Sequence, residues 1–205
     1  LYAVIEADTP VEMVVFYDVP NESVICDNQK IRTLQNFCEL EEMPKALCTK
    51  IVTAGVNTIF TQYSRSPVGD AMRVRFIEDN ADRLTAVYKM TNRGDSKLAS
   101  RAAVFSAIFI ALSMGGEEST LANFAACVAT GFTNTPTENA AIVLRNNLIR
   151  ERAGGRAACE RMFRVSLRAI NDFNNGIARK RNYYQGVEKL PWYDAFKEEV
   201  MKNYL

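Results

Sequence analysis

The longest uncharged apolar stretch of this 205-residue chain is AAVFSAIFIALSMGG, residues 102–116. The stretch is shorter than the roughly 20 residues that a membrane-spanning helix needs. It also contains serines and ends in a glycine pair. A segment with no charged face must be covered by other parts of the chain, so we expect a buried core helix here. We find no membrane span and no secretory signal peptide, and we expect no membrane partner.

Apolar residues recur at helical spacing through much of the remaining sequence. Leu34, Phe37 and Leu40 are three residues apart near the front of the chain, and Phe163 and Leu167 are four apart further on. This spacing places apolar side chains on one face of a helix. The sequence therefore predicts a mainly α-helical protein with a helical-bundle core.

Two regions of the N-terminal half alternate as strands do. Residues 11–19 (VEMVVFYDV) are rich in β-branched and aromatic residues and precede the turn PNES. Residues 72–78 (MRVRFIE) and 84–90 (LTAVYKM) alternate on either side of DNADR. We therefore expect one or two short β-hairpins in this half of the chain.

These patterns divide the chain into three parts. Residues 1–29 form an extended or β-hairpin N-terminal arm. Residues 30–182 form a mainly helical core with a short hairpin near 72–90. Residues 183–205 form a C-terminal segment, which contains a helix over LPWYDAFKEEVMKNYL but lies apart from the core. Extended terminal segments are thus expected on both sides of the core.

The groups that catalysis most often uses are missing from the sequence. There is no histidine, and the five cysteines form no C-x-x-C pair. An odd cysteine count without such a pair indicates neither a disulfide framework nor a zinc site. No phosphate-binding loop, dinucleotide fingerprint or nucleophile elbow is present. The sequence therefore predicts a protein that is not an enzyme and holds no cofactor or metal. An enzyme that uses carboxylates, lysine or a bound cofactor is the further alternative.

Charge is unevenly distributed, although the net charge is only +1. Residues 1–50 contain nine acidic and four basic residues, a balance of −5. Residues 144–181 contain ten basic and three acidic residues, a balance of +7. The N-terminal part of the chain is thus acidic and a later region is basic. The net charge of the whole chain does not reveal this local difference.

The basic region extends from residue 145 to residue 184 and is richer in arginine than in lysine. Arginine suits bidentate binding of phosphate or carboxylate. Basic groups followed by tyrosines suit single-stranded nucleic acid, which presents phosphates together with exposed base faces. The candidate RNA-binding residues are Arg145, Arg150, Arg152, Arg161, Arg164, Arg168, Arg179, Lys180, Arg181, Tyr183 and Tyr184.

Two other interpretations of this region are a solvated helix face and a network of structural ion pairs. Glu160 lies four residues before Arg164, and Arg168 lies four residues before Asp172. Each such pair contributes only about 0.3–0.5 kcal/mol when exposed. We expect Arg168 and Asp172 to form a structural ion pair, although phosphate is an alternative partner of Arg168.

Two short motifs resemble the coat proteins of flexuous filamentous plant RNA viruses. RAINDFNNGI, residues 168–177, resembles the Asp-Phe-x-x-Gly region near the end of the core in that family. STLANFAACVA, residues 119–129, resembles its Thr-[Phe/Leu]-x-x-[Phe/Leu/Val]-Cys segment, and the separation of about fifty residues is also similar. Where many members have an arginine just after the Thr-Phe pair, this chain has Ala122 and Asn123.

The resemblance implies a helical core with terminal arms that clasp neighbouring subunits, and single-stranded RNA bound in a basic groove without sequence preference. Asp172 carries over by match as a structural ion-pair partner. We therefore expect a viral coat or nucleocapsid protein that packages single-stranded RNA and assembles with identical subunits into helical filaments. Its location would be the virion and the host cytoplasm. The alternative is a non-enzymatic helical protein-interaction module that binds no nucleic acid.

Overall fold

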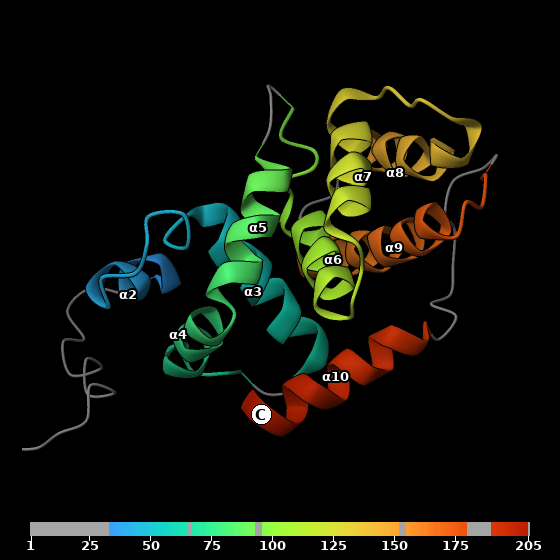
Figure 1. Ribbon diagram of the computed structural model, residues 1–205. Coiled ribbons are helices and arrows are strands. Elements are labelled where there is room, and N and C mark those ends of the chain that lie inside the picture. Colours follow the sequence, from blue (N-terminus) through green and yellow to red (C-terminus); the bar gives the residue numbers. More distant parts are fainter. Residues whose placement is uncertain (1–32, 65–66, 93–95, 152–154, 180–189, 205) are drawn as a thin grey trace, which may run out of the picture. The chain divides into compact units, whose positions relative to one another are not determined.

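The computed structural model describes residues 33–64, 67–92, 96–151, 155–179 and 190–204. All of them belong to Arg32–Leu205, the second of two compact units into which the chain divides. The predicted N-terminal arm, residues 1–29, lies outside the described residues. The described part of the chain is mainly helical and contains no strand (Figure 1).

The apolar segment does form the central helix, α6 (Ala102–Ser113). Every residue from 103 to 111 is buried. α6 packs most extensively against α9 (Arg156–Asn174) and α3 (Lys50–Tyr63), and it also contacts α5, α7 and α10. A helix without a polar face is stable only when it is surrounded in this way. The prediction of a buried core helix is confirmed.

The other helices cover α6 or pack around its neighbours. In chain order they are α2 (Leu34–Leu40), α4 (Asp70–Asp79), α5 (Ala81–Thr91), α7 (Glu118–Thr130), the 3-10 helix η2 (Pro136–Glu138), α8 (Asn139–Arg150) and α10 (Pro191–Tyr204). Local signals explain several of their ends. Thr33 and Asn36 form a capping box at α2, and the Thr49 side chain accepts a hydrogen bond from the Val52 amide at the start of α3.

Close approach of α3 and α6 is possible because Gly55 has no side chain. A Cβ atom at Gly55 would lie 2.3 Å from Cδ1 of Phe105. At the same crossing, the buried Ser106 hydroxyl donates to the Gly55 carbonyl over 2.8 Å. These contacts hold together two of the helices on which α9 rests.

The predicted hairpin near residues 72–90 is wrong, because this region forms α4 and α5. Phe76 and Ile77 are both buried although they are adjacent. Adjacent residues of a strand point to opposite faces, whereas on a helix both can face the core. In α5 the buried residues Leu84, Val87 and Thr91 are three and four apart, which is helical spacing.

The helix predicted within residues 183–205 forms as α10, but it packs against the core and does not lie apart from it. α10 contacts α3 and α6 and buries Phe196 and Val200. The Phe196 ring lies 6.1 Å from that of Phe109 on α6, centroid to centroid. The Tyr204 ring lies 5.0 Å from that of Phe76. Aromatic contacts of this kind anchor α10 to the bundle.

Candidate nucleic-acid interface

The last four turns of α9 present only arginine and asparagine outside the core. From Arg161 to Asn175, six positions are not buried. We call these six residues the α9 row: Arg161, Arg164, Arg168, Asn171, Asn174 and Asn175. Arg168 and Asn171 are half-buried and the other four are exposed. The only acidic residue of this stretch, Asp172, is buried.

The α9 row follows one side of the helix because its members are mostly three or four residues apart. The opposite side carries apolar residues such as Phe163, Leu167 and Ile170, which are fully buried. At about 1.5 Å of rise per residue, the row extends over roughly 20 Å. The packing of α9 on α6 and α8 therefore fixes a straight line of cationic and amide groups.

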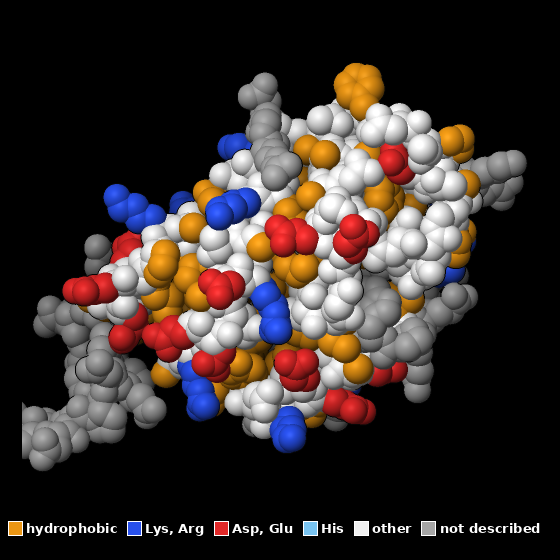
Figure 2. Space-filling model, viewed as in Figure 1, with side chains coloured by type: hydrophobic (Ala, Val, Ile, Leu, Met, Phe, Trp, Pro, Cys, Tyr) orange, Lys and Arg blue, Asp and Glu red, His pale blue; other side chains and the backbone are white. Residues whose placement is uncertain are grey.

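The face of the bundle drawn in Figure 2 carries charges of both signs. Lysine and arginine side chains lie there among aspartate and glutamate. On α4, for example, Arg75 lies 3.8 Å from Asp79 and Arg73 lies 2.9 Å from Asp70. Such mixed surfaces attract polyanions weakly. The α9 row differs because none of its six members is acidic.

The N-terminal end of the α9 row contacts one carboxylate. Nε of Arg161 donates to Oε2 of Glu151 over 3.1 Å, and Nη2 of Arg161 contacts the same oxygen. Glu151 is the residue that follows α8, so this pair joins α8 to α9. The Arg161 side chain keeps 55% of its surface exposed. One turn earlier, Arg156 lies 4.0 Å from Glu160.

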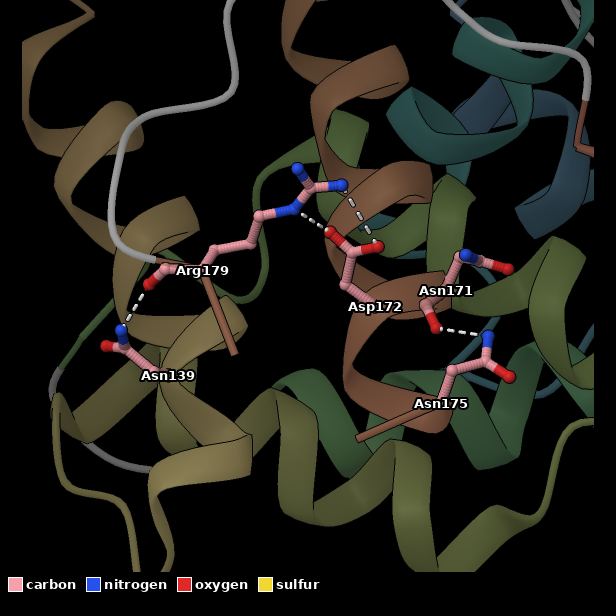
Figure 3. Close-up of polar contacts among 5 residues, drawn as sticks. All are labelled: Asn139, Asn171, Asp172, Asn175 and Arg179. Carbon is pink, nitrogen blue, oxygen red and sulfur yellow. Dashed lines mark hydrogen bonds and ion pairs between the residues drawn. The ribbon is translucent and has the colours of Figure 1, made fainter. Parts of the chain in front are cut away.

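Near the C-terminal end of the row, the buried Asp172 forms an ion pair with the half-buried Arg179 (Figure 3). Nε of Arg179 lies 2.5 Å from Oδ2 of Asp172, and Nη2 lies 3.4 Å from Oδ1. The Asp172 side chain is only 3% exposed. The Asn139 amide donates to the Arg179 carbonyl, so the backbone of Arg179 is held as well.

A tight turn places Arg179 beside Asp172. Gly176 has φ of +63°, a left-handed conformation that glycine adopts readily. The Ile177 amide donates to the Asp172 carbonyl over 2.8 Å, which satisfies one of the last carbonyls of α9. The chain thus reverses and returns the Arg179 side chain to the helix. The sequence NNG after Phe173 is a typical signal for such a helix end.

Arg145 has a structural role that the sequence did not indicate. Its Nη1 donates to the carbonyls of Val128 and Ala129 at 2.7 and 2.6 Å. These carbonyls belong to the last turn of α7, where a positive charge is favourable. The guanidinium of Arg145 therefore caps α7 and does not belong to the α9 row.

The other predicted residues divide between those that the structure describes and those that it does not. Arg150 is exposed in the last turn of α8. Arg152, Lys180, Arg181, Tyr183 and Tyr184 lie outside the described residues. The ion pair between Arg168 and Asp172 stays a prediction, and Arg179 is a partner of Asp172 that the sequence did not predict.

Three features of the site were missed from the sequence. Arg179 lies seven residues after Asp172, so the usual search at three and four residues does not pair them. Glu151 and Arg161 lie on different helices, and only the packing of α8 on α9 brings them together. The asparagines of the α9 row were not singled out, although their spacing continues that of the arginines.

The described side chains offer little for metal binding or thiol chemistry. No cluster of three or more potential ligands among histidine, cysteine, aspartate and glutamate occurs in this part of the chain. Burial raises the pKa of the Cys38 thiol to about 12, so it stays protonated at neutral pH. Burial also raises the pKa of Cys127. None of the helices in the described ranges has the length and hydropathy of a membrane span.

Comparisons with protein-family models, curated proteins and solved structures give no match to this chain.

Proposed function

We propose that this protein is a viral coat or nucleocapsid-type protein that packages single-stranded RNA, with the α9 row as part of its RNA-binding surface. The observation that carries the proposal is the composition of the row. Six successive non-buried positions on one helix carry three arginines, three asparagines and no acid. A line of positive charge held by a rigid helix suits a polyanion whose phosphates follow a line.

Phosphate is the expected main ligand of the arginines in this row. Arg164 is exposed, and Arg161 keeps more than half of its side-chain surface exposed despite its contact with Glu151. Guanidinium groups bind phosphate oxygens through two parallel hydrogen bonds. Contacts to phosphate do not depend on the base, so most of the binding free energy would be independent of sequence. Arg150 would extend this surface onto α8.

The assembly of identical subunits into a helical filament is part of the same proposal. Residues 1–50 have a charge balance of −5, and residues 144–181 one of +7. An acidic surface on one copy that meets a basic surface on the next copy gives a head-to-tail contact, which repeats along a filament. The virion and the host cytoplasm are the locations that this proposal implies.

Negative-stain electron microscopy of protein purified without nuclease tests the proposal. We expect long helical particles that contain RNA and that become shorter or disappear after ribonuclease treatment. Small discrete particles that lack nucleic acid, with an ultraviolet spectrum of pure protein, would contradict the proposal.

A helical protein-interaction module is the second candidate, and one observation favours it. Arg145, Arg161 and Arg179 all contact protein groups, which is what a structural role of these arginines would show. This candidate predicts a stable complex with another protein and no retained RNA.

A further inference from the structure

The α9 row changes its chemistry halfway along the helix. Arg161, Arg164 and Arg168 carry positive charge, whereas Asn171, Asn174 and Asn175 carry neutral amides. A neutral amide gains less than a guanidinium from a phosphate. It does match the edge of a base, because it presents a donor and an acceptor side by side. The two halves of the row are therefore suited to different parts of a nucleotide.

The two asparagines drawn in Figure 3, Asn171 and Asn175, point to the same side of α9, away from Arg179. The Asn175 amide nitrogen donates to the Asn171 carbonyl over 2.7 Å. This bond fixes the plane of the Asn175 side-chain amide. It does not use the Oδ1 atom or the second N–H of that amide. The base-facing amide would thus be oriented before any ligand binds.

The turn after α9 supports this arrangement. The Asp172–Arg179 ion pair and the bond from Asn139 to the Arg179 carbonyl tie the following residues back to α8 and α9. Recognition groups on a rigid helix lose less conformational entropy on binding than groups on a mobile loop. The asparagines therefore lie at a helix end that these two contacts hold in place.

We propose that the amides of Asn171, Asn174 and Asn175 contact bases and favour adenine in the bound single strand. Asparagine pairs with adenine through the N6 amino group and the N7 acceptor. In single-stranded RNA this edge is accessible, whereas in duplex RNA it lies in a deep and narrow major groove. The preference is added to phosphate binding by the arginines, and it rests on the proposed function of the same row.

Fluorescence anisotropy with short labelled RNAs tests this inference. The probes are an oligoadenylate, the same oligomer with 7-deaza-adenine, and an oligouridylate. Replacement of N7 by carbon removes one acceptor but keeps the charge and the stacking surface of adenine. We expect the wild-type protein to bind oligoadenylate about fivefold more tightly than the 7-deaza oligomer.

The matched variants are Asn171→Ala/Asn174→Ala/Asn175→Ala and, as a control, Asn203→Ala on the exposed surface of α10. The triple variant should bind oligoadenylate and its 7-deaza form equally, and oligouridylate as the wild type does. The control should keep the fivefold difference.

Equal binding of the two adenine oligomers by the wild type, or a fivefold difference that survives in the triple variant, would overturn the inference and leave the proposed function standing. Absence of binding to all three RNAs would overturn both. If the triple variant does not fold, Asn174→Ala/Asn175→Ala at the two exposed positions is compared in the same way, and an undiminished fivefold difference in it overturns the inference.

Discussion

Two arginine–carboxylate pairs lie near the two ends of the α9 row, and their surroundings differ. Arg161 and Glu151 have side chains that are 55% and 14% exposed. Arg179 and Asp172 have side chains that are 36% and 3% exposed. The chemistry of the two pairs is the same, so the difference in burial decides what each arginine is able to do.

Water competes for the Arg161–Glu151 pair, and such exposed pairs contribute at most about 1 kcal/mol. Arg161 can therefore exchange the carboxylate for a phosphate at less cost than Arg179 can, because the Glu151 side chain keeps 14% of its surface exposed and that of Asp172 only 3%. Asp172 has almost no access to water, and a buried carboxylate without its partner is strongly unfavourable. Arg179 therefore stabilises the fold. Arg161, by contrast, remains able to bind a ligand.

Removal of the buried charge should have the largest effect on stability. We expect Asp172→Asn to lower the free energy of unfolding by about 2–3 kcal/mol, because the charge-assisted hydrogen bonds from Arg179 lose their anionic acceptor and the turn after α9 loosens. Urea denaturation followed by circular dichroism measures this. The control is Asp82→Asn on the exposed surface of α5, which should change the free energy by less than about 0.5 kcal/mol. Equal effects of the two substitutions on the free energy of unfolding would show that Asp172 stabilises the fold no more than an exposed aspartate does.

Arg145 tests whether a further arginine of the basic region is structural. Arg145→Met should lower the free energy of unfolding by about 1–2 kcal/mol, because two carbonyls at the end of α7 lose a charged donor. Arg150→Met, one exposed arginine further along α8, should leave stability nearly unchanged. Thermal and urea unfolding of both variants decide the matter. A stable Arg145→Met protein with reduced RNA binding would assign Arg145 to the interface instead.

The exposed pair should respond in the opposite way to the buried one. Glu151→Gln should cost less than about 1 kcal/mol of stability. It also removes a carboxylate that contacts the α9 row, so RNA affinity should rise by about threefold at low salt. Anisotropy titrations of wild type and variant measure the change. Weaker RNA binding by Glu151→Gln would show that Glu151 holds Arg161 in the orientation that RNA requires.

How far the sequence predicts the fold depends on how many patterns a segment satisfies. Residues 102–116 show only one pattern, a long uncharged apolar segment. The core helix α6 was therefore predicted correctly. Residues 72–90 satisfy two, because Leu84, Val87 and Thr91 are helically spaced while charged residues alternate with apolar ones. Packing against α6 and α3 decides between them in favour of helices. No local pattern contains that information.

The candidate site shows the same limit. Arg161, Arg164 and Arg168 were predicted as RNA-binding residues, and the structure places all three outside the buried core. The partners of Arg161, Arg145 and Arg179 were not predicted, because Glu151, the end of α7 and Asp172 reach them only through tertiary packing or a tight turn. Sequence spacing identifies the face of a helix, but it does not identify what the neighbouring element places against that face.

The most direct test of the central claim is a charge reversal of the α9 row, Arg161→Glu/Arg164→Glu/Arg168→Glu, compared with Arg75→Glu/Arg83→Glu/Lys97→Glu. The control alters three exposed basic residues elsewhere and changes the net charge equally. Binding to a single-stranded RNA is titrated at several salt concentrations.

We expect the row variant to lose at least about 100-fold in affinity, and the slope of log affinity against log salt to fall by about 2, as three phosphate contacts are lost. The control should lose far less. Equal losses in the two variants would show that total charge, and not the α9 row, governs binding, and would contradict the account.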